Sequence, residues 1–334
     1  MRPFARVGLF AVAALLACSA GARAGFVLGD ASQYALLFEG GGGNTLQITN
    51  VTTNTTGGGT GVAAGQGGGI GNIGVGNTGK VSLSGPGTIN GNLDIAAVNN
   101  GQVTGGGVTI KGSTNYGVGM VASALNTVSA LNATLGALSG TSVAVNGNTT
   151  INVSPGMFSA SGAGYTNVRV FDVSSLSLNS GQTLTINGDA NGDAVVLNFG
   201  SGNWNFHGNV VLTGGLTPDD VIFNFVGGSG LSGGPTLDIN NGGGSPSNGS
   251  FLSQGIFLDP NGPISVVNSN VLGRVFGGDS HDFQYVSGSN ITAPTPSTAV
   301  PAPSTVALAL AGAVPLGLLA VLRRRCRVAP TLPA

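Results

Sequence analysis

Short segments in which apolar and polar residues alternate occur along most of the chain. Residues 46–49 and 81–83 show this alternation, and a period of two is typical of a strand with one buried side. Further short apolar segments lie at residues 88–90, 93–95, 108–110, 176–178, 184–186, 194–199, 210–212, 221–225, 264–267 and 271–276. Asn-Gly and Gly-Gly turn signals separate many of them. The pattern therefore predicts an all-β fold built from many short strands.

One region, residues 113–140, has a different period. Its apolar residues are spaced three or four apart, at Val121, Leu125, Val128, Leu131, Leu135 and Leu138. This spacing predicts a single amphipathic helix that lies along the β core. Ser113, Thr114 and Asn115 are candidate N-cap residues, and Gly140 is a candidate stop signal at the C-terminal end.

The corners between the strands favour an irregular β-solenoid with this helix packed alongside. Glycine makes up 61 of the 334 residues, and Asn268 and Asn270 alternate with apolar residues near a predicted corner. In a solenoid, coils stack on one another and polar side chains form ladders along the turns. No strict repeat of six or nine residues is present, so the coils must be irregular, and a β-sandwich is the alternative.

The N-terminal segment has the parts of a secretory signal peptide in the expected order. Arg2 and Arg6 precede an apolar run at residues 7–17, and Ala22 and Ala24 form an A-x-A cleavage site. The eleven residues of the run would rise only about 17 Å as a hydrophobic helix, which is too short to span a bilayer. The segment 1–24 is therefore predicted to direct export through the Sec translocon and to be removed.

Both cysteines lie in the terminal segments. Cys18 ends a Leu-Leu-Ala-Cys sequence that is similar to a bacterial lipoprotein box, so lipidation of Cys18 is the alternative to cleavage after Ala24. Cys326 lies near the C-terminus. The part of the chain between them therefore has no disulfide, no zinc-thiolate site and no cysteine nucleophile.

The C-terminal region joins a Pro-rich spacer, residues 293–304, to an apolar run at residues 306–322. The run has 17 residues and would rise about 26 Å as a hydrophobic helix, enough to cross a thin membrane. An arginine cluster follows the run and consists of Arg323, Arg324, Arg325 and Arg327. Because positive charge stays on the cytoplasmic side, residues 328–334 are predicted to be a cytoplasmic tail and the body to lie outside.

The order of spacer, apolar run and arginine cluster resembles the PEP-CTERM sorting signal of Gram-negative bacteria. Pro301 and Pro303 flank Ala302, where the signal usually has a glutamate. The resemblance implies that residues 305–327 hold the chain in the inner membrane and that an exosortase then cuts the chain near residues 300–304. The processing residues would be those of both termini, namely Ala22, Ala24, Pro301, Pro303, Arg323, Arg324 and Arg325.

Removing both termini changes the charge of what remains. Residues 25–300 carry four Lys and Arg residues against all twelve carboxylates, a net charge of −8, although the whole chain has a formal charge of −1. Nucleic acids and anionic lipid surfaces are bound by clusters of basic residues. Four scattered cations argue against nucleic acid as a partner, and we predict membrane contact only through the C-terminal hydrophobic helix.

Three segments of the body resemble the choice-of-anchor A domain, a bacterial extracellular family attached by differing C-terminal signals. They are residues 184–189, 211–219 and 273–280, and the resemblance covers residues 26–292. We therefore assign residues 25–292 to one such domain. More distantly, strands followed by one long helix and further strands are similar to ice-binding-like adhesin domains. Both resemblances imply surface attachment and bring no catalytic residues.

Two groups of polar residues are candidate metal sites. Asp189, Asn191 and Asp193 place oxygen ligands at alternate positions, as calcium loops do, but the carboxylate expected at the twelfth position is replaced by glycine. Turns at a strand corner explain these residues more simply, and calcium is the only cofactor that we expect to be worth testing. Asp279 and His281 would share one side of a strand and form a weak site.

One aromatic group is a candidate carbohydrate site. His207 lies close to Trp204 and Phe206, which would stack on sugar rings if they were exposed and would belong to the core if they were buried.

The sequence as a whole favours a secreted, exosortase-sorted surface or matrix protein without catalytic activity. Its expected partners are extracellular polysaccharide and matrix components. The first alternative is a polysaccharide-acting enzyme on a β-helix, which needs clustered acidic and basic residues. The second is an ice-binding-type adhesin, which needs a flat face of regularly spaced threonines, and the run at residues 52–56 is too short to supply one.

Overall fold

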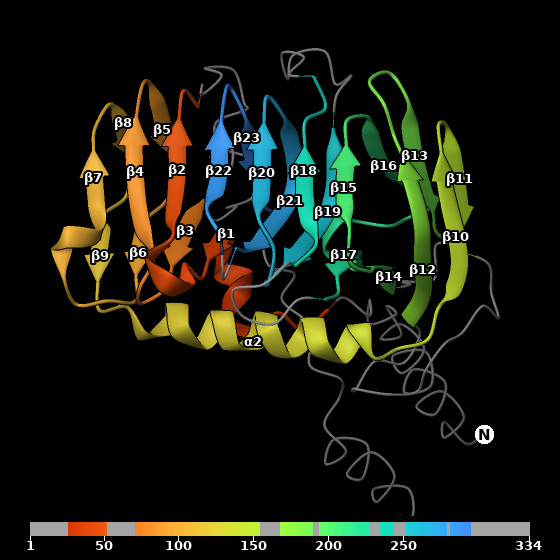
Figure 1. Ribbon diagram of the computed structural model, residues 1–334, viewed down its shortest axis with the longest axis horizontal. Coiled ribbons are helices and arrows are strands. Elements are labelled where there is room, and N and C mark those ends of the chain that lie inside the picture. Colours follow the sequence, from red (N-terminus) through yellow and green to blue (C-terminus); the bar gives the residue numbers. More distant parts are fainter. Residues whose placement is uncertain are drawn as a thin grey trace, which may run out of the picture. The chain divides into compact units, whose positions relative to one another are not determined.

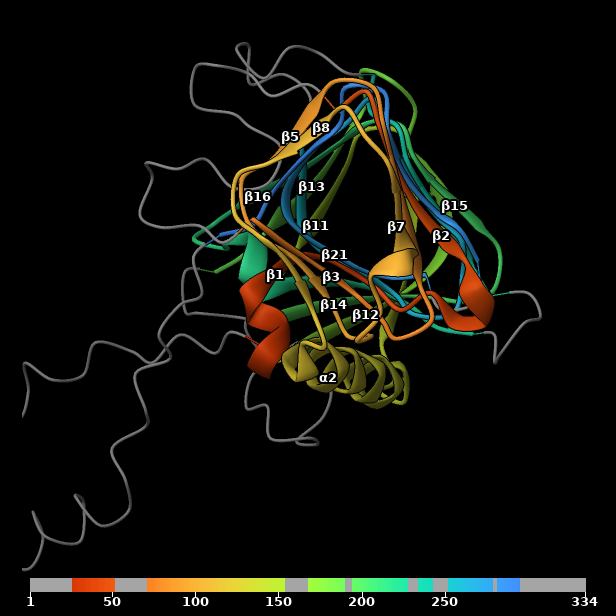
Figure 2. The same ribbon diagram turned by 90° about the vertical axis from the view of Figure 1, so that its left-hand side faces the viewer.

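The strands form a parallel β-helix with three faces and one long helix beside it (Figures 1 and 2). This computed structural model describes residues 26–51, 71–153, 168–189, 194–227, 234–242, 252–278 and 281–294. All of these residues belong to the compact unit Arg23–Ser297, and the second unit, Met1–Ala22 with Thr298–Ala334, lies outside them.

Face A is the longest face, and its strands all pair in parallel. In spatial order it contains β10 (Thr141–Asn146), β12 (Val168–Ser177), β14 (Ala194–Phe199), β17 (Val221–Phe225), β19 (Ser253–Asp259), β21 (Asn270–Gly277), β1 (Tyr34–Phe38), β3 (Asn72–Val75), β6 (Leu93–Ile95) and β9 (Thr114–Tyr116). Figure 2 shows this face next to the helix α2 (Gly119–Gly136).

Faces B and C complete each coil. Face B is a seven-stranded sheet of β15 (Asn203–Phe206), β18 (Thr236–Ile239), β20 (Ile264–Val267), β22 (Phe283–Val286), β2 (Thr45–Thr49), β4 (Lys80–Ser84) and β7 (Val103–Gly105). Face C contains β11 (Thr149–Asn152), β13 (Thr183–Asn187), β16 (Asn209–Thr213), β23 (Asn290–Thr292), β5 (Gly87–Ile89) and β8 (Val108–Ile110).

Short 3-10 turns connect some strands, namely η1 (Gly29–Gln33), η2 (Gly41–Gly43), η3 (Asn100–Gln102) and η4 (Pro218–Asp220).

The path of the helix α2 along the solenoid explains why the first and last coils are neighbours in the middle of the solenoid. Strands β1 to β9 stack toward one end, α2 then runs back along face A, and β10 to β23 return from the other end (Figure 1). The last coil therefore meets the first. At this seam β21 pairs with β1, as Val275 with Leu36, and β22 pairs with β2, as Phe283 with Leu46.

The predicted helix is confirmed, but both of its predicted ends are wrong. Its apolar side, including Val121 and Leu135, is buried against face A. The helix begins at Gly119, because Thr114–Tyr116 pairs with β6 as strand β9. The N-cap is therefore Val118, which makes no side-chain capping bond, instead of Ser113, Thr114 or Asn115. Gly140 lies beyond the end of the helix, and its N–H donates to the carboxylate of Asp172 at 2.9 Å.

The interior between the faces is filled by stacked apolar side chains, with phenylalanines from successive coils above one another. The ring centroids of Phe223 and Phe257 are 4.7 Å apart, and those of Phe199 and Phe225 are 4.8 Å apart. Such pairs contribute about 0.5–1.5 kcal/mol each beyond the burial of their area. Aromatic stacking thus reinforces the backbone pairing between coils.

Polar ladders line one corner of the coil, as the sequence predicts. Asn50, Asn268 and Ser287 all have positive φ and follow strands β2, β20 and β22, which lie side by side on face B. Next to them the hydroxyl of buried Ser269 donates to the carbonyl of Val267 at 2.7 Å. A left-handed residue at the same point in neighbouring coils turns the chain from face B to face C.

The predicted all-β solenoid with one helix alongside is confirmed, and the sandwich alternative is wrong because every pair among the described strands is parallel. Each predicted strand segment overlaps an observed strand. Strands without a separate prediction are β1, β3, β7, β9, β10, β11, β15, β18, β19, β22 and β23. The predicted terminal helices lie outside the described residues, and in the described part of the chain no helix has the length and apolar character needed to cross a membrane.

Candidate functional site: the outer side of face B

Face B carries a row of polar side chains on its outer side. One outward residue from each strand lies beside the outward residue of the next, in the order Asn205, Asp238, Ser265, Gln284, Gln47, Ser82 and Thr104. We call these seven residues the face B ladder. Among the described elements none lies on the outer side of this face, whereas α2 covers face A (Figures 1 and 2).

The alternation of residue types along each strand creates the ladder. On β2, for example, Leu46 and Ile48 are fully buried inside the coil, and Gln47 between them faces outward. Parallel pairing then repeats this arrangement from strand to strand about every 4.8 Å. The result is a regular array of amide and hydroxyl groups on the sheet that Figure 2 shows on the right, with β2, β7 and β15.

Hydrogen bonds hold some of the outer side chains in place. The hydroxyls of Thr49 and Ser84, in the row next to the ladder, are 2.8 Å apart. The carboxylate of Asp282 accepts a 2.8 Å hydrogen bond from the backbone N–H of Thr45. These contacts fix the outer side chains of neighbouring strands relative to one another.

One contact between a histidine and an aspartate lies at the β15 end of the ladder. The Nε2 atom of His207 is 3.0 Å from the Oδ2 atom of Asp238, and both side chains are about one-third exposed. The centre of the ladder, from Ser265 to Ser82, consists of serine and glutamine residues and has no charged side chain.

The predicted aromatic sugar-binding patch is absent from this surface. Trp204 and Phe206 point into the core, where the ring of Phe199 lies 5.0 Å and 5.7 Å from theirs. The indole N–H of Trp204 donates to the carbonyl of Gly200 at 2.8 Å. The strand β15 alternates exposed and buried residues, so both aromatic residues necessarily face inward while Asn205 faces outward. Of the predicted patch, only His207 reaches the surface.

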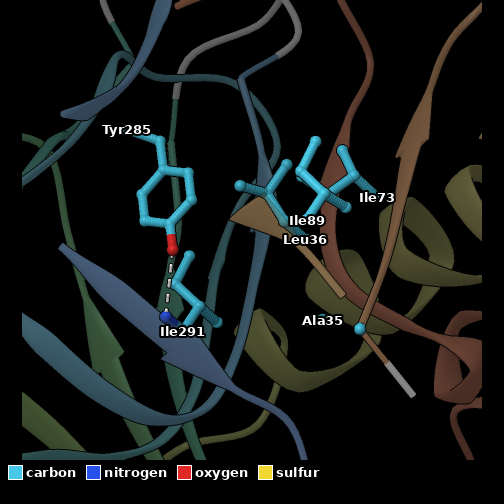
Figure 3. Close-up of a pocket in the computed structure, with 7 residues that line it drawn as sticks. Ala35, Leu36, Ile73, Ile89, Tyr285 and Ile291 are labelled. Carbon is cyan, nitrogen blue, oxygen red and sulfur yellow. Dashed lines mark hydrogen bonds between the residues drawn. The ribbon is translucent and has the colours of Figure 1, made fainter. Parts of the chain in front are cut away.

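A cavity inside the solenoid is too small to be a ligand site. Figure 3 shows it between strands at the seam, lined by apolar residues that include Leu36 and Ile73. The hydroxyl of Tyr285 accepts a 3.2 Å hydrogen bond from the backbone N–H of Ile291, so this polar group is already satisfied. The free volume is about 10 Å³, close to the minimum that a single water molecule needs.

Both candidate metal sites stay predictions, because each is only partly described by the structure. Asn191, Asp193 and Asp279 lie outside the described residues, and Asp189 and His281 lie within them. Over the described ranges, no group of three or more His, Cys, Asp or Glu side chains is arranged to hold a metal ion.

The processing residues also remain predictions. The signal peptide with Ala22 and Ala24, the lipoprotein cysteine Cys18, and Pro301, Pro303 and the arginine cluster of the sorting segment all lie outside the described residues.

The face B ladder is the candidate site that sequence reasoning missed. Gln47, Ser82 and Ser265 each stand between two apolar residues in a predicted strand, which predicts that they face outward. The sequence pattern does not show which strands pair with one another. Gln47 lies next to Gln284, which is far away in sequence, and only the return of the chain along α2 brings them together.

Comparisons with known proteins give a distant likeness in fold. No family model and no curated protein matches the chain. The solved structures that it resembles include an ice-binding protein from an Antarctic biological consortium, with 13% identity, a TM-score of 0.46, and coverage of 81% of this chain and 91% of that one. An ice-binding protein with antifreeze activity from an Arctic yeast has 14% identity, a TM-score of 0.43 and coverage of 84% and 98%. An ice-binding protein from an Antarctic Flavobacteriaceae bacterium has 17% identity, a TM-score of 0.43 and coverage of 83% and 51%. These scores are too low to carry an argument about what this chain binds.

Proposed function

We propose that this chain is an exported, non-enzymatic surface protein that binds extracellular polysaccharide through the outer side of face B. The observation that carries the proposal is the face B ladder, seven polar side chains in register on an uncovered sheet of the described structure. A polymer whose own polar groups repeat would meet a matching array of hydrogen-bonding groups. Such a surface gains affinity from many weak contacts along one chain.

The chemistry of the ladder suits sugar hydroxyl groups. Gln47 and Gln284 offer amide groups that both donate and accept hydrogen bonds, and Ser82 and Ser265 offer hydroxyls that do the same. The uncharged centre of the ladder favours a neutral or weakly charged polymer over a polyanion, because polyanion binding requires clustered cations.

The proposal includes export and sorting by the terminal segments. The signal-peptide pattern before Gly25 and the PEP-CTERM-like pattern at residues 301–327 support Sec export, transient membrane anchoring and cutting by an exosortase. Mass spectrometry of both termini of the protein recovered from the cell surface tests this part. We expect the mature chain to start at Gly25 and to end within residues 300–304, and an intact C-terminus would contradict sorting.

Ice binding is the second candidate function. It is favoured by the regular spacing of outward groups on face B, which suits an ordered water surface as well as a polymer. The ladder contains one threonine, Thr104, together with two glutamines and Asp238, so it is less uniform than a threonine array. Thermal hysteresis of the purified protein would support this candidate over polysaccharide binding.

The alternative that this chain is a polysaccharide-acting enzyme has less support than polysaccharide binding or ice binding. Asp238 of the ladder and the neighbouring His207 are titratable residues, and their side chains contact each other. Release of unsaturated sugars from a bacterial polysaccharide would establish the enzyme and contradict the proposal.

The binding proposal is tested with purified protein and two insoluble probes, microcrystalline cellulose and a bacterial exopolysaccharide. We expect the protein to sediment with at least one probe, and Gln284→Lys to reduce the bound fraction severalfold, because a long cation in the middle of the ladder blocks close contact. The matched control is Ser129→Lys, which adds the same charge to an exposed position of α2 on the other side of the molecule. Equal binding by both variants would contradict the role of face B.

A further inference from the structure

A second row of side chains runs beside the face B ladder and has a different chemistry. It lies two residues further along each strand and consists of Val267, Val286, Thr49 and Ser84. Both valines are half-buried and face outward, because the residues before them, Val266 and Tyr285, are buried inside the coil. Two apolar side chains therefore lie next to the polar centre of the ladder.

Charged side chains lie on the opposite side of the ladder. Asp282 and Lys80 are both exposed, and both neighbour Thr45, which comes two residues before Gln47. The ladder and the second row together carry no charge from β20 to β4, and we call this part of face B the central strip. The central strip thus has amides and hydroxyls along one edge and valines along part of the other.

The dimensions of face B favour a linear ligand that crosses the strands. The seven strands lie side by side in Figure 1, and at about 4.8 Å between neighbours the ladder extends roughly 29 Å across them. The longest strands, β2 and β4, have five residues, which corresponds to roughly 13 Å along the strand. A linear ligand therefore makes more contacts across the strands than along one of them.

The two rows match the two kinds of surface on a sugar ring. A pyranose ring with equatorial hydroxyls has polar edges and apolar faces made of C–H groups. In a β-1,4-linked chain such rings form a flat, extended ribbon, and each ring advances by a length close to one strand spacing. An α-1,4-linked chain of the same sugar is curved and does not follow a straight row.

We infer that face B binds a neutral β-1,4-linked glycan that crosses the strands along the central strip, with about one sugar unit per strand. The C–H faces of the rings lie against Val267 and Val286, and the ring hydroxyls exchange hydrogen bonds with Gln284 and Gln47. The inference rests on the proposed polysaccharide binding and deepens it, because it names the class of polymer and its direction. It also assigns Val267 and Val286 as specificity-determining residues.

The length of a soluble ligand tests the direction of binding. Ligand-detected NMR titration of the purified full chain with β-1,4-linked glucose oligomers of two to six units gives the affinity for each length. We expect the affinity to rise with every added unit, because the ladder offers seven positions. A plateau at two or three units would show a ligand that lies along a strand, and it would overturn the inference, as would the absence of binding by the six-unit oligomer.

The matched ligand control is the series of α-1,4-linked glucose oligomers of the same lengths. These oligomers contain the same sugar, so they differ from the test series in linkage and shape alone. We expect no gain in affinity with length for this series. An equal gain for both series would overturn the preference for a β-1,4-linked chain.

Two matched substitutions locate the ligand on the ladder. Ser265→Arg leaves four uninterrupted ladder positions on one side, and Ser82→Arg leaves five. We expect each variant to bind the six-unit oligomer severalfold more weakly than the parent and the three-unit oligomer about equally well. If either substitution leaves the affinity for the six-unit oligomer unchanged, the ligand does not cross the strands along the ladder.

The contact with the apolar side chains is tested with Val286→Thr, which keeps the shape of the side chain and adds a hydroxyl. We expect severalfold weaker binding of the six-unit oligomer. The matched control is Val211→Thr, at a half-buried outward valine of β16 on face C, and it should bind as the parent does. Equal affinities of the two variants would overturn the role of Val286, and circular dichroism checks that both keep the native strand content.

Failure of the inference and failure of the proposed function are distinguishable. A chain that sediments with the bacterial exopolysaccharide but shows no gain with the length of the β-1,4-linked oligomers overturns only the inference. A chain that sediments with neither insoluble probe contradicts the proposed function, and the inference falls with it.

Discussion

Asn132 on α2 and Asn224 on β17 bind each other in both directions across the buried contact between helix and sheet. The side-chain N–H of Asn132 donates to the Oδ1 atom of Asn224 at 2.8 Å, and the side-chain N–H of Asn224 donates to the backbone carbonyl of Asn132 at 3.3 Å. Asn198 on the neighbouring strand accepts from Asn224 at 2.9 Å and donates to the carbonyl of Leu135 near the end of the helix. This amide network fixes the position of the helix along face A.

We predict that Asn224→Leu lowers the free energy of unfolding by about 1–3 kcal/mol, because it leaves buried amide groups without partners. The double variant Asn132→Leu/Asn224→Leu should lose less than the sum of the two single variants. The next strand has Leu258 at the position that pairs with Asn224, so leucine fits this row of the sheet. Urea unfolding measures all three variants, and strict additivity would contradict the coupling.

The buried carboxyl of Asp259 makes the stability of the chain dependent on pH. Asp259 is fully buried, its Oδ1 accepts from the N–H of Gly262 at 3.0 Å, and its Oδ2 has no hydrogen-bond partner among the described residues. Burial raises the pKa of Asp259 well above its usual range. The folded state thus holds a proton that the unfolded chain releases at about pH 4, so the stabilisation by this group is lost as the pH rises from about 4 through the raised pKa.

We therefore predict that Asp259→Asn is more stable than the parent at pH 7 to 8, by about 1 kcal/mol or more, and that the advantage shrinks toward pH 4. The asparagine keeps an acceptor for the N–H of Gly262 and carries no charge to bury. Urea unfolding across this pH range measures the effect. A pH profile of Asp259→Asn that runs parallel to that of the parent would contradict the prediction.

Glycine is required at the corner before Arg274. Gly273 has φ near +149°, and a Cβ atom there would be 1.8 Å from the carbonyl oxygen of Gly255 in the neighbouring coil. We predict that Gly273→Ala costs about 3 kcal/mol or more, because backbone strain and a steric clash add together. Gly101→Ala is the control, since nothing lies within 4 Å of a Cβ atom at that position. Thermal unfolding should separate the two variants clearly.

Binding to a polysaccharide should depend little on salt. The centre of the face B ladder is uncharged, and the carboxylate of Asp238 near its β15 end contacts the His207 ring at 3.0 Å. Exposed charges lose most of their long-range effect above about 0.1 M salt. We expect the bound fraction to change less than about twofold between 0.05 and 0.5 M sodium chloride. A steep fall with salt would indicate that ion pairs carry the binding.

The elements of the fold that depend on local pattern could be predicted from the sequence. The apolar spacing at residues 121–138 gave the helix, and strict alternation gave strands such as β2 and β13. The start of the helix was misplaced because residues 114–116 pair with β6, and that tertiary contact outweighs the capping signal of Thr114. Local pattern cannot reveal such pairings.

The candidate site depends on long-range pairing and could not be predicted. The apolar residues on either side of Gln47 in the sequence predict that it faces outward. Only the pairing of the first coil with the last places it beside Gln284. Arg274 lies in the predicted strand segment 271–276, but its contacts with the carbonyls of Pro294 and Ser32 depend on residues that are brought together only by the fold. The interior positions of Trp204 and Phe206 are set by the strand β15, which the sequence pattern did not identify.

The path of the chain along α2 also sets the order in which the protein can fold. Tyr34 and Arg274 are 240 positions apart, yet they touch, and β1 receives its neighbour β21 only when nearly the whole body has been synthesised. Contacts of such high sequence separation form slowly, and an incomplete coil leaves its backbone groups unpaired until the final strands arrive. A nascent chain with this connectivity keeps β1 and β2 without their partners β21 and β22 until those strands have been synthesised, so the solenoid closes only near the end of synthesis.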